Sequence, residues 1–216
     1  MPAPLRRQRA ATLARGLTTA AVLGATAAWW GPAWCAVLAP LIEAALAVIT
    51  PSWDTVRVAL ASDGDQAVLT ALFSTVHGFA YHGFAVPPGV WVRTQTLQGY
   101  AWQHPVILLT LWAAWPMPNP AARLRAGAML LAAMVPVAVL DLSLALYGSL
   151  TDLMLAGTAP ALAARSFPVQ AMQVLEAGGR AALALAVGVG LLASLASASR
   201  PSRVSPGGTA GTRMPR

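Results

Sequence analysis

Residues 126–150 read AGAMLLAAMVPVAVLDLSLALYGSL, and Asp141 is the only charged side chain in these 25 positions. A helix that crosses the hydrocarbon core of a bilayer needs about 20 predominantly apolar residues. This segment therefore predicts a transmembrane helix, with Pro136 and Asp141 inside it.

Three more apolar runs surround this segment in the sequence. The first, residues 17–50, contains Pro32 and Glu43. It predicts a span from Leu17 to Leu38, kinked near Pro32 because proline lacks an N–H group and crowds the preceding turn, followed by an apolar outer helix from Leu41 to Ile49 with Glu43 at the membrane interface. The other two runs are residues 100–116, bounded by tryptophans that suit an aromatic belt, and residues 181–198.

Composition agrees with a membrane protein of one domain. Of the 216 residues, 57% are hydrophobic and 10% are charged, against about 25% charged residues in soluble domains. This balance excludes an intrinsically disordered chain and argues against an ordinary soluble domain. We predict a membrane all-α bundle of four transmembrane helices with a small extracytoplasmic β-hairpin or three-stranded element.

The arginines predict the orientation of the four spans. All 14 basic residues are arginine, and ten of them lie in three segments without Asp or Glu. The positive-inside rule places these segments in the cytoplasm of a bacterial inner (plasma) membrane protein. The cations flank apolar runs instead of forming a folded basic surface, so we expect no nucleic acid partner. The ten cytoplasmic arginines are Arg6, Arg7, Arg9, Arg15, Arg123, Arg125, Arg200, Arg203, Arg213 and Arg216.

This orientation divides the chain into segments on alternating sides of the membrane. Residues 1–16 form a cytoplasmic basic tail, and residues 17–50 form the first helix with its outer extension. Residues 51–99 are extracytoplasmic, residues 100–198 hold the remaining helices with an outer loop at 151–180, and residues 199–216 are a disordered cytoplasmic tail. One alternative stays open: Ala25-Thr26-Ala27 also resembles the cleavage site of a signal peptide, and cleavage there would leave three spans.

The extracytoplasmic segment has the periodicity of β-strands. Side chains alternate over Thr55–Leu60, Asp63-Gly64 is a favoured hairpin turn, and Gln66–Phe73 suits the returning strand. Val90–Gln98 predicts a third strand after the turn at Pro87-Pro88-Gly89. In the second outer loop, Leu153–Ala164 predicts a short interfacial helix.

Asp141 is the strongest candidate for a functional or structural polar site. A carboxylate in the bilayer costs a few kcal/mol and needs a partner or a water-filled cavity. Arg180, at the outer start of the fourth span, is a candidate partner because its long side chain can reach inward. Tyr147 lies on a nearby face of the third helix. The residues leave two interpretations open, a proton or substrate site and a structural pair, and the structural pair is favoured.

The other reactive side chains favour structural roles. His77 and His82 are weak metal candidates, because a spacing of five residues suits neither a helix face nor a strand face and no third ligand is near. We therefore expect no metal and no cofactor. His104 is expected at the membrane interface, and the lone Cys35 is expected to be a buried packing residue.

Small residues recur at every fourth position of the last span and of the first. This spacing lets helices approach closely in a partner interface, but in so alanine-rich a chain internal bundle packing or chance is the favoured interpretation. Helix-packing positions are Ala186, Gly190 and Ser194 in the last span, flanked by Ala182 and Ala198, and Ala20, Gly24 and Ala28 in the first.

The overall layout resembles the small accessory membrane proteins encoded with exosortases of Gram-negative bacteria. The local features that accompany it are Pro136 and Asp141 in the third span and Glu176-Ala-Gly-Gly-Arg180 before the fourth. The resemblance is one of arrangement and transfers no functional residue. The chain does not resemble the transpeptidase itself, because Cys35 stands in Ala33-Trp34-Cys35-Ala36 and not in a Cys-Ser-Gly context.

The sequence contains no phosphate-binding loop, nucleophile elbow or zinc-protease motif. The leading hypothesis is therefore a non-catalytic accessory or scaffolding component of an envelope, export or conjugation apparatus, with a membrane-protein partner or a homo-oligomer. The alternative hypothesis is a small oligomeric transporter or proton-coupled membrane enzyme that uses Asp141.

Overall fold

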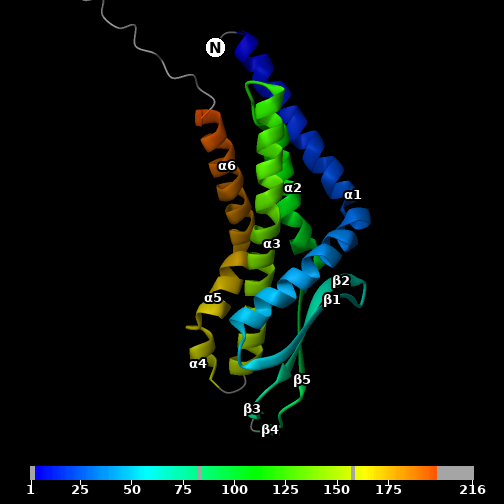
Figure 1. Ribbon diagram of the computed structural model, residues 1–216, viewed down its shortest axis with the longest axis vertical. Coiled ribbons are helices and arrows are strands. Elements are labelled where there is room, and N and C mark those ends of the chain that lie inside the picture. Colours follow the sequence, from blue (N-terminus) through cyan, green and yellow to red (C-terminus); the bar gives the residue numbers. More distant parts are fainter. Residues whose placement is uncertain (1–2, 82–83, 157–158, 199–216) are drawn as a thin grey trace, which may run out of the picture.

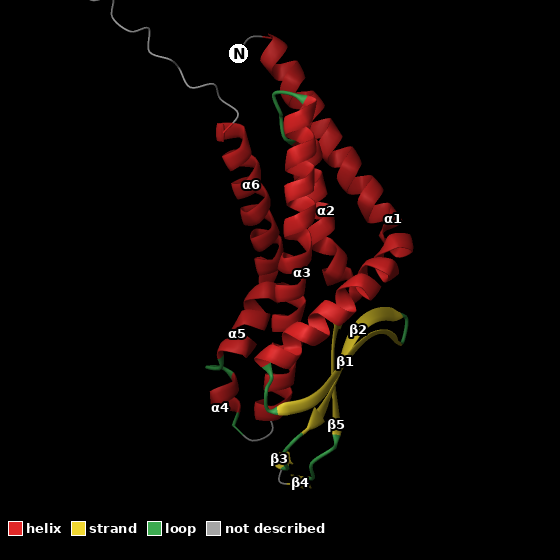
Figure 2. Ribbon diagram, viewed as in Figure 1, coloured by secondary structure: helices red, strands yellow, loops and turns green. Residues whose placement is uncertain are grey.

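A computed structural model describes residues 3–81, 84–156 and 159–198. Helices form a long bundle at one end of the molecule, and the strands gather at the other end (Figures 1 and 2). The predicted tail at residues 199–216 lies outside the described residues.

Helix α1 spans Ala3–Ile49 and contains both Pro32 and Pro40. It changes direction about midway along its length, so that its second half crosses the bundle above the strands (Figure 1). Proline removes one backbone hydrogen bond and crowds the preceding turn, which accounts for a bend in an otherwise continuous helix. The indole Nε1 of Trp34 donates to the carbonyl of Ala101 over 2.9 Å and fastens the bend to the next helix.

Helices α2 (Gln98–Ala114) and α3 (Pro120–Ala156) pack against α1 and against each other, and α6 (Arg180–Ala198) packs against α2 and α3. Three described helical segments are long and apolar enough to cross a membrane, namely Ala10–Ile49, Pro120–Ala156 and Phe167–Ser197. Helix α2 has only 17 residues, shorter than the usual span, and it is enclosed by α1, α3 and α6. The fourth predicted span therefore remains a proposal.

The predicted small antiparallel sheet is confirmed. Its strand order is β1-β2-β5, and the strands are β1 (Trp53–Asp63), β2 (Gln66–Thr75) and β5 (Trp91–Leu97). The β1–β2 turn consists of Gly64 and Asp65, one position later than the pair predicted, because Gly64 adopts the positive φ of 59° that the turn needs. The short hairpin of β3 (Phe79–Tyr81) and β4 (Phe84–Val86) was not predicted.

One face of the sheet packs on the helices. Val58, Leu69, Ala71 and Phe73 are buried in one cluster with the second half of α1 and with the part of α3 that follows Pro136. The Glu43 side chain on α1 accepts a hydrogen bond from the backbone N–H of Val58 over 2.7 Å, so this carboxylate caps the outer edge of β1. The sheet is thus held by α1 and α3, as a small sheet requires.

The second outer loop differs from its prediction. No separate helix spans Leu153–Ala164: residues 153–156 are the last turn of α3, and α4 covers only Pro160–Ala163. Proline is preferred in the first turn of a helix, so Pro160 starts a new helix instead of continuing the old one. Helix α5 (Phe167–Val174) and the π-helical turn η1 (Leu175–Gly179) then lead directly into α6.

Candidate functional site

A buried ionic cluster joins α2, α3 and α6. The Asp141 carboxylate accepts a hydrogen bond from Arg180 Nε, at 3.0 Å to Oδ1 and 3.1 Å to Oδ2. His104 Nε2 lies 2.8 Å from Asp141 Oδ2. The exposed fractions are 0% for Asp141, 0% for His104 and 1% for Arg180, so this cluster of Asp141, His104 and Arg180 is shielded from solvent.

The chain around Arg180 is shaped by two glycines. Gly178 has a φ of 111°, a conformation that other residues rarely adopt. A Cβ on Gly179 would lie 2.5 Å from the carbonyl oxygen of Val174. These two positions allow the π-helical turn to bend and α6 to begin at Arg180, which places this side chain at the start of the helix and directs it toward α3.

A third glycine brings α5 against α3. A Cβ on Gly148 would lie 2.5 Å from both the carbonyl oxygen of Pro168 and the Cβ of Met172. This close approach of α5 to α3 fixes where the following residues run. Gly148 therefore contributes to the placement of Arg180 although it does not touch it.

Tyr100 covers the guanidinium group of Arg180. The Cζ atom of Arg180 lies 3.8 Å from the centroid of the Tyr100 ring, a cation–π contact. Tyr100 is one helical turn before His104 on α2, so the two residues lie on the same side of this helix, Tyr100 against Arg180 and His104 against Asp141. Helix α2 thus contributes an imidazole and an aromatic ring to the cluster.

Three nitrogen atoms of the cluster have no hydrogen-bond partner among the described residues, namely Nη1 and Nη2 of Arg180 and Nδ1 of His104. The buried hydroxyl groups of Ser143 on α3 and Thr110 on α2 also have none. Buried polar atoms of this kind are commonly satisfied by bound water. The Asp141 carboxylate, by contrast, has both of its oxygens engaged.

The structure brings together two of the three predicted polar candidates. Asp141 and Arg180 form the predicted pair, whereas Tyr147 lines a separate cavity further along α3. His104, for which the sequence suggested only an interfacial position, is fully buried against Asp141. The position of His104 inside an apolar run was a sequence signal for a buried polar contact. Its partner, Asp141, lies 37 residues away in the sequence, so the contact itself could not be predicted.

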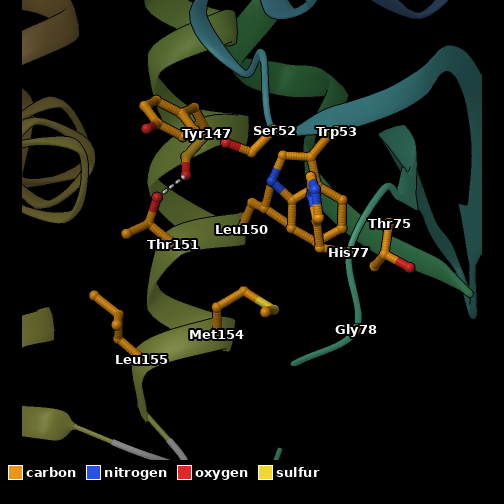
Figure 3. Close-up of a pocket in the computed structure, with 10 residues that line it drawn as sticks. All are labelled: Ser52, Trp53, Thr75, His77, Gly78, Tyr147, Leu150, Thr151, Met154 and Leu155. Carbon is orange, nitrogen blue, oxygen red and sulfur yellow. Dashed lines mark hydrogen bonds between the residues drawn. The ribbon is translucent and has the colours of Figure 1, made fainter. Parts of the chain in front are cut away.

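The cavity beside Tyr147 lies between α3 and the sheet and has a volume of about 340 Å³. Figure 3 shows Tyr147, Leu150 and Met154 on one wall and Trp53 and His77 on the other. The Tyr147 carbonyl accepts a hydrogen bond from the hydroxyl group of Thr151 over 2.8 Å. The walls are mainly apolar, and His77 is the only titratable nitrogen among the residues that line the cavity.

Over residues 3–81, 84–156 and 159–198, no group of three His, Cys, Asp or Glu side chains could hold a metal ion. His77 lies at the cavity, and His82 lies outside the described residues. Cys35 is 1% exposed and belongs to the apolar cluster with Leu38 and Ala138, which is the packing position expected for it.

The small residues of α6 that the sequence singled out do not pack inside the bundle. Ala186, Gly190 and Ser194 are exposed, and a Cβ on Gly190 would meet nothing within 4 Å. The buried face of α6 instead carries Ala184, Gly188 and Leu192. The two sets have the same spacing of four residues, so spacing alone could not separate them.

Comparisons with protein-family models, with curated proteins and with solved structures found no match. The class that the fold itself supports is a multi-pass membrane protein with a small antiparallel sheet at one end of its helices.

Proposed function

We propose that this chain is a non-catalytic accessory or scaffolding protein of a bacterial inner membrane, which holds or positions a partner protein through its outer sheet. The observation that carries the proposal is the enclosure of Asp141, whose carboxylate is fully buried and engaged by two side chains. A carboxylate held in this way cross-links helices. The same enclosure argues against the alternative, in which Asp141 would carry a proton or a substrate through a polar cavity.

The proposed topology has four spans with both termini in the cytoplasm. The arginine distribution supports it, since Arg123 and Arg125 lie in the first turns of α3, at the end of the helices opposite the strands. Helix α2 is the shortest proposed span at about 26 Å for its 17 residues. Its enclosure by three other helices makes a short span tolerable.

The held sheet supports a role in presenting a surface. Glu43 fastens β1 to α1, and the apolar cluster fastens the sheet to α3, so the outer element is fixed relative to the bundle. The proposed setting is an envelope, export or conjugation apparatus, and the resemblance to exosortase-associated accessory proteins belongs to the same proposal.

The test is co-purification of the full chain from its native membranes in a mild detergent, followed by cross-linking and mass spectrometry. The expected result is a second membrane protein in constant ratio to this chain, also in the Asp141→Asn variant once it is folded. A single species that is catalytically active without a partner would contradict the proposal. Loss of the partner in a folded Asp141→Asn variant would favour the alternative role of Asp141.

A further inference from the structure

The face of the sheet turned away from α1 and α3 carries a row of two arginines with a leucine between them. The register pairs Arg57 on β1 with Leu72 on β2, and Leu72 with Arg93 on β5. Side chains paired across neighbouring strands project from the same face. The backbones of the two outer strands lie about 10 Å apart, twice the spacing of adjacent strands. We call Arg57, Leu72 and Arg93 the arginine row.

The cations of the arginine row are exposed and are not neutralised by acids. Arg93 Nη2 donates to the side-chain oxygen of Gln95 over 3.1 Å, and Gln95 in turn donates to Asp63. Arg57 makes no hydrogen bond or ion pair with any part of the chain that the structure describes. The nearby carboxylate of Asp63 is therefore bound to an amide, and both guanidinium groups remain open to an outside anion.

Apolar surface adjoins the arginine row. Trp91 lies on the same face as Arg93, two residues earlier on β5, and is 53% exposed. Beside these two residues lies a cavity of about 280 Å³, which Val86 and Met154 also line. A ligand that reaches the arginine row can thus place an apolar group next to its anionic groups.

We propose that the arginine row, Trp91 and the adjoining cavity form the docking surface for an extended segment of a partner protein that carries acidic side chains at every second position, with apolar side chains next to them on the same side. This inference rests on the proposed partner-holding function and names the chemistry of the partner. Alternation with a period of two puts the carboxylates on one side of an extended segment, toward Arg57 and Arg93, with apolar side chains flanking them. Charge complementarity selects the acids, and the cavity selects the apolar side chains.

The chain's own terminal segments do not fit this surface. Residues 199–216 carry four arginines and no acid, so the docking surface would repel them. Helix α6, which leads into that segment, ends at the opposite end of the molecule from the sheet, as does the beginning of α1 (Figure 1). The occupant is therefore a different molecule.

The test uses the full chain in phosphatidylcholine nanodiscs and a fluorescent peptide, Leu-Thr-Glu-Thr-Glu-Thr-Leu, titrated by anisotropy. We expect saturable binding that weakens about tenfold when both Glu residues of the peptide are replaced by Gln, because two exposed ion pairs contribute about this much between them. The Arg57→Glu/Arg93→Glu double variant should bind the acidic peptide at least tenfold more weakly than the wild type. Binding should also weaken with added salt.

Arg165→Glu provides the matched control, because Arg165 is also exposed and lies outside the sheet. It should bind the peptide as the wild type does. Equal losses in Arg165→Glu and in the double variant would overturn the proposal, and so would an absence of peptide binding by the wild type. Binding of phosphatidylglycerol vesicles that is lost in the double variant, without peptide binding, would assign the surface to lipid and overturn it as well.

Failure of this inference is distinguishable from failure of the proposed function. If a partner co-purifies equally with the wild type and with the Arg57→Glu/Arg93→Glu variant, the partner-holding function stands and the docking surface is wrong. If no partner co-purifies with the wild type, the proposed function itself fails.

Discussion

Replacing Asp141 by alanine removes the acceptor that holds both His104 and Arg180. Arg180 Nε is shared between two carboxylate oxygens and counts as one donor, and His104 Nε2 is the second. A hydrogen bond to a charged group contributes about 1.5–3 kcal/mol. Breaking a buried ion pair by removing one partner costs about 3–5 kcal/mol, since it leaves the other charge uncompensated. We expect the Asp141→Ala variant to lose about 3–5 kcal/mol of unfolding free energy.

The assay is unfolding in mixed micelles by titration with sodium dodecyl sulfate, followed by circular dichroism. Asp141→Asn keeps the shape and one acceptor but loses the charge, so its loss should be about half as large. The Asp141→Leu/Arg180→Met double variant replaces the pair by apolar side chains. It should recover part of the loss, because such replacements of buried pairs are commonly neutral or stabilising, while the buried His104 Nε2 stays without its acceptor at a cost of about 1–3 kcal/mol.

The Asp141→Leu/Arg180→Met variant distinguishes the loss of the ionic link between α3 and α6 from an unrelated packing effect. Asp152→Ala is the matched control on the same helix, since this carboxylate is only partly buried and its loss should change stability by less than about 0.5 kcal/mol. The reasoning would be refuted if Asp141→Ala unfolded within about 0.5 kcal/mol of the wild type. It would equally be refuted if the effects of the Asp141 and Arg180 substitutions simply added, because coupled partners do not behave additively.

Three further predictions concern other parts of the molecule. Glu43→Ala should speed hydrogen exchange of the Val58 amide by roughly fivefold to tenfold, because about 1 kcal/mol of hydrogen bonding is lost. Glu43→Gln keeps an acceptor and should retain most of the protection of this amide. Unchanged exchange in Glu43→Ala would disprove the contact. Gly148→Ala should lower the unfolding free energy by about 1–3 kcal/mol in the detergent assay, because the new Cβ would collide with α5. Gly190→Ala has open space around its Cβ and should leave the unfolding free energy unchanged. Equal behaviour of the two variants would contradict the close approach of α5 to α3. Reporters fused after Asp63, Ala121, Ser166 and Gly207 should lie outside, inside, outside and inside the cytoplasmic membrane, in that order. A reporter on the wrong side at any of these sites would overturn the four-span topology.

The sequence predicted the membrane class and the outer sheet because both depend on local patterns. Long apolar runs and alternating side chains are readable without knowing what packs against them. Alternation is clear in β5, whereas β2, in the middle of the sheet, is buried on both faces and was predicted from its place after the turn. The β3–β4 hairpin could not be predicted from side-chain alternation, because each of its strands has only 3 residues, too few to show a period.

Tertiary structure decided the rest, since it depends on which faces meet. The sequence marked Asp141 as a side chain that needs a partner and offered Arg180, but only the packing of α2 against α3 brought His104 into the cluster. The small residues of α6 show the same division, because two stripes with identical spacing exist and the neighbouring helices determine which one is buried. Apolar content makes three of these helices suitable for crossing a membrane, and the contacts between helices determine which polar atoms meet inside the bundle.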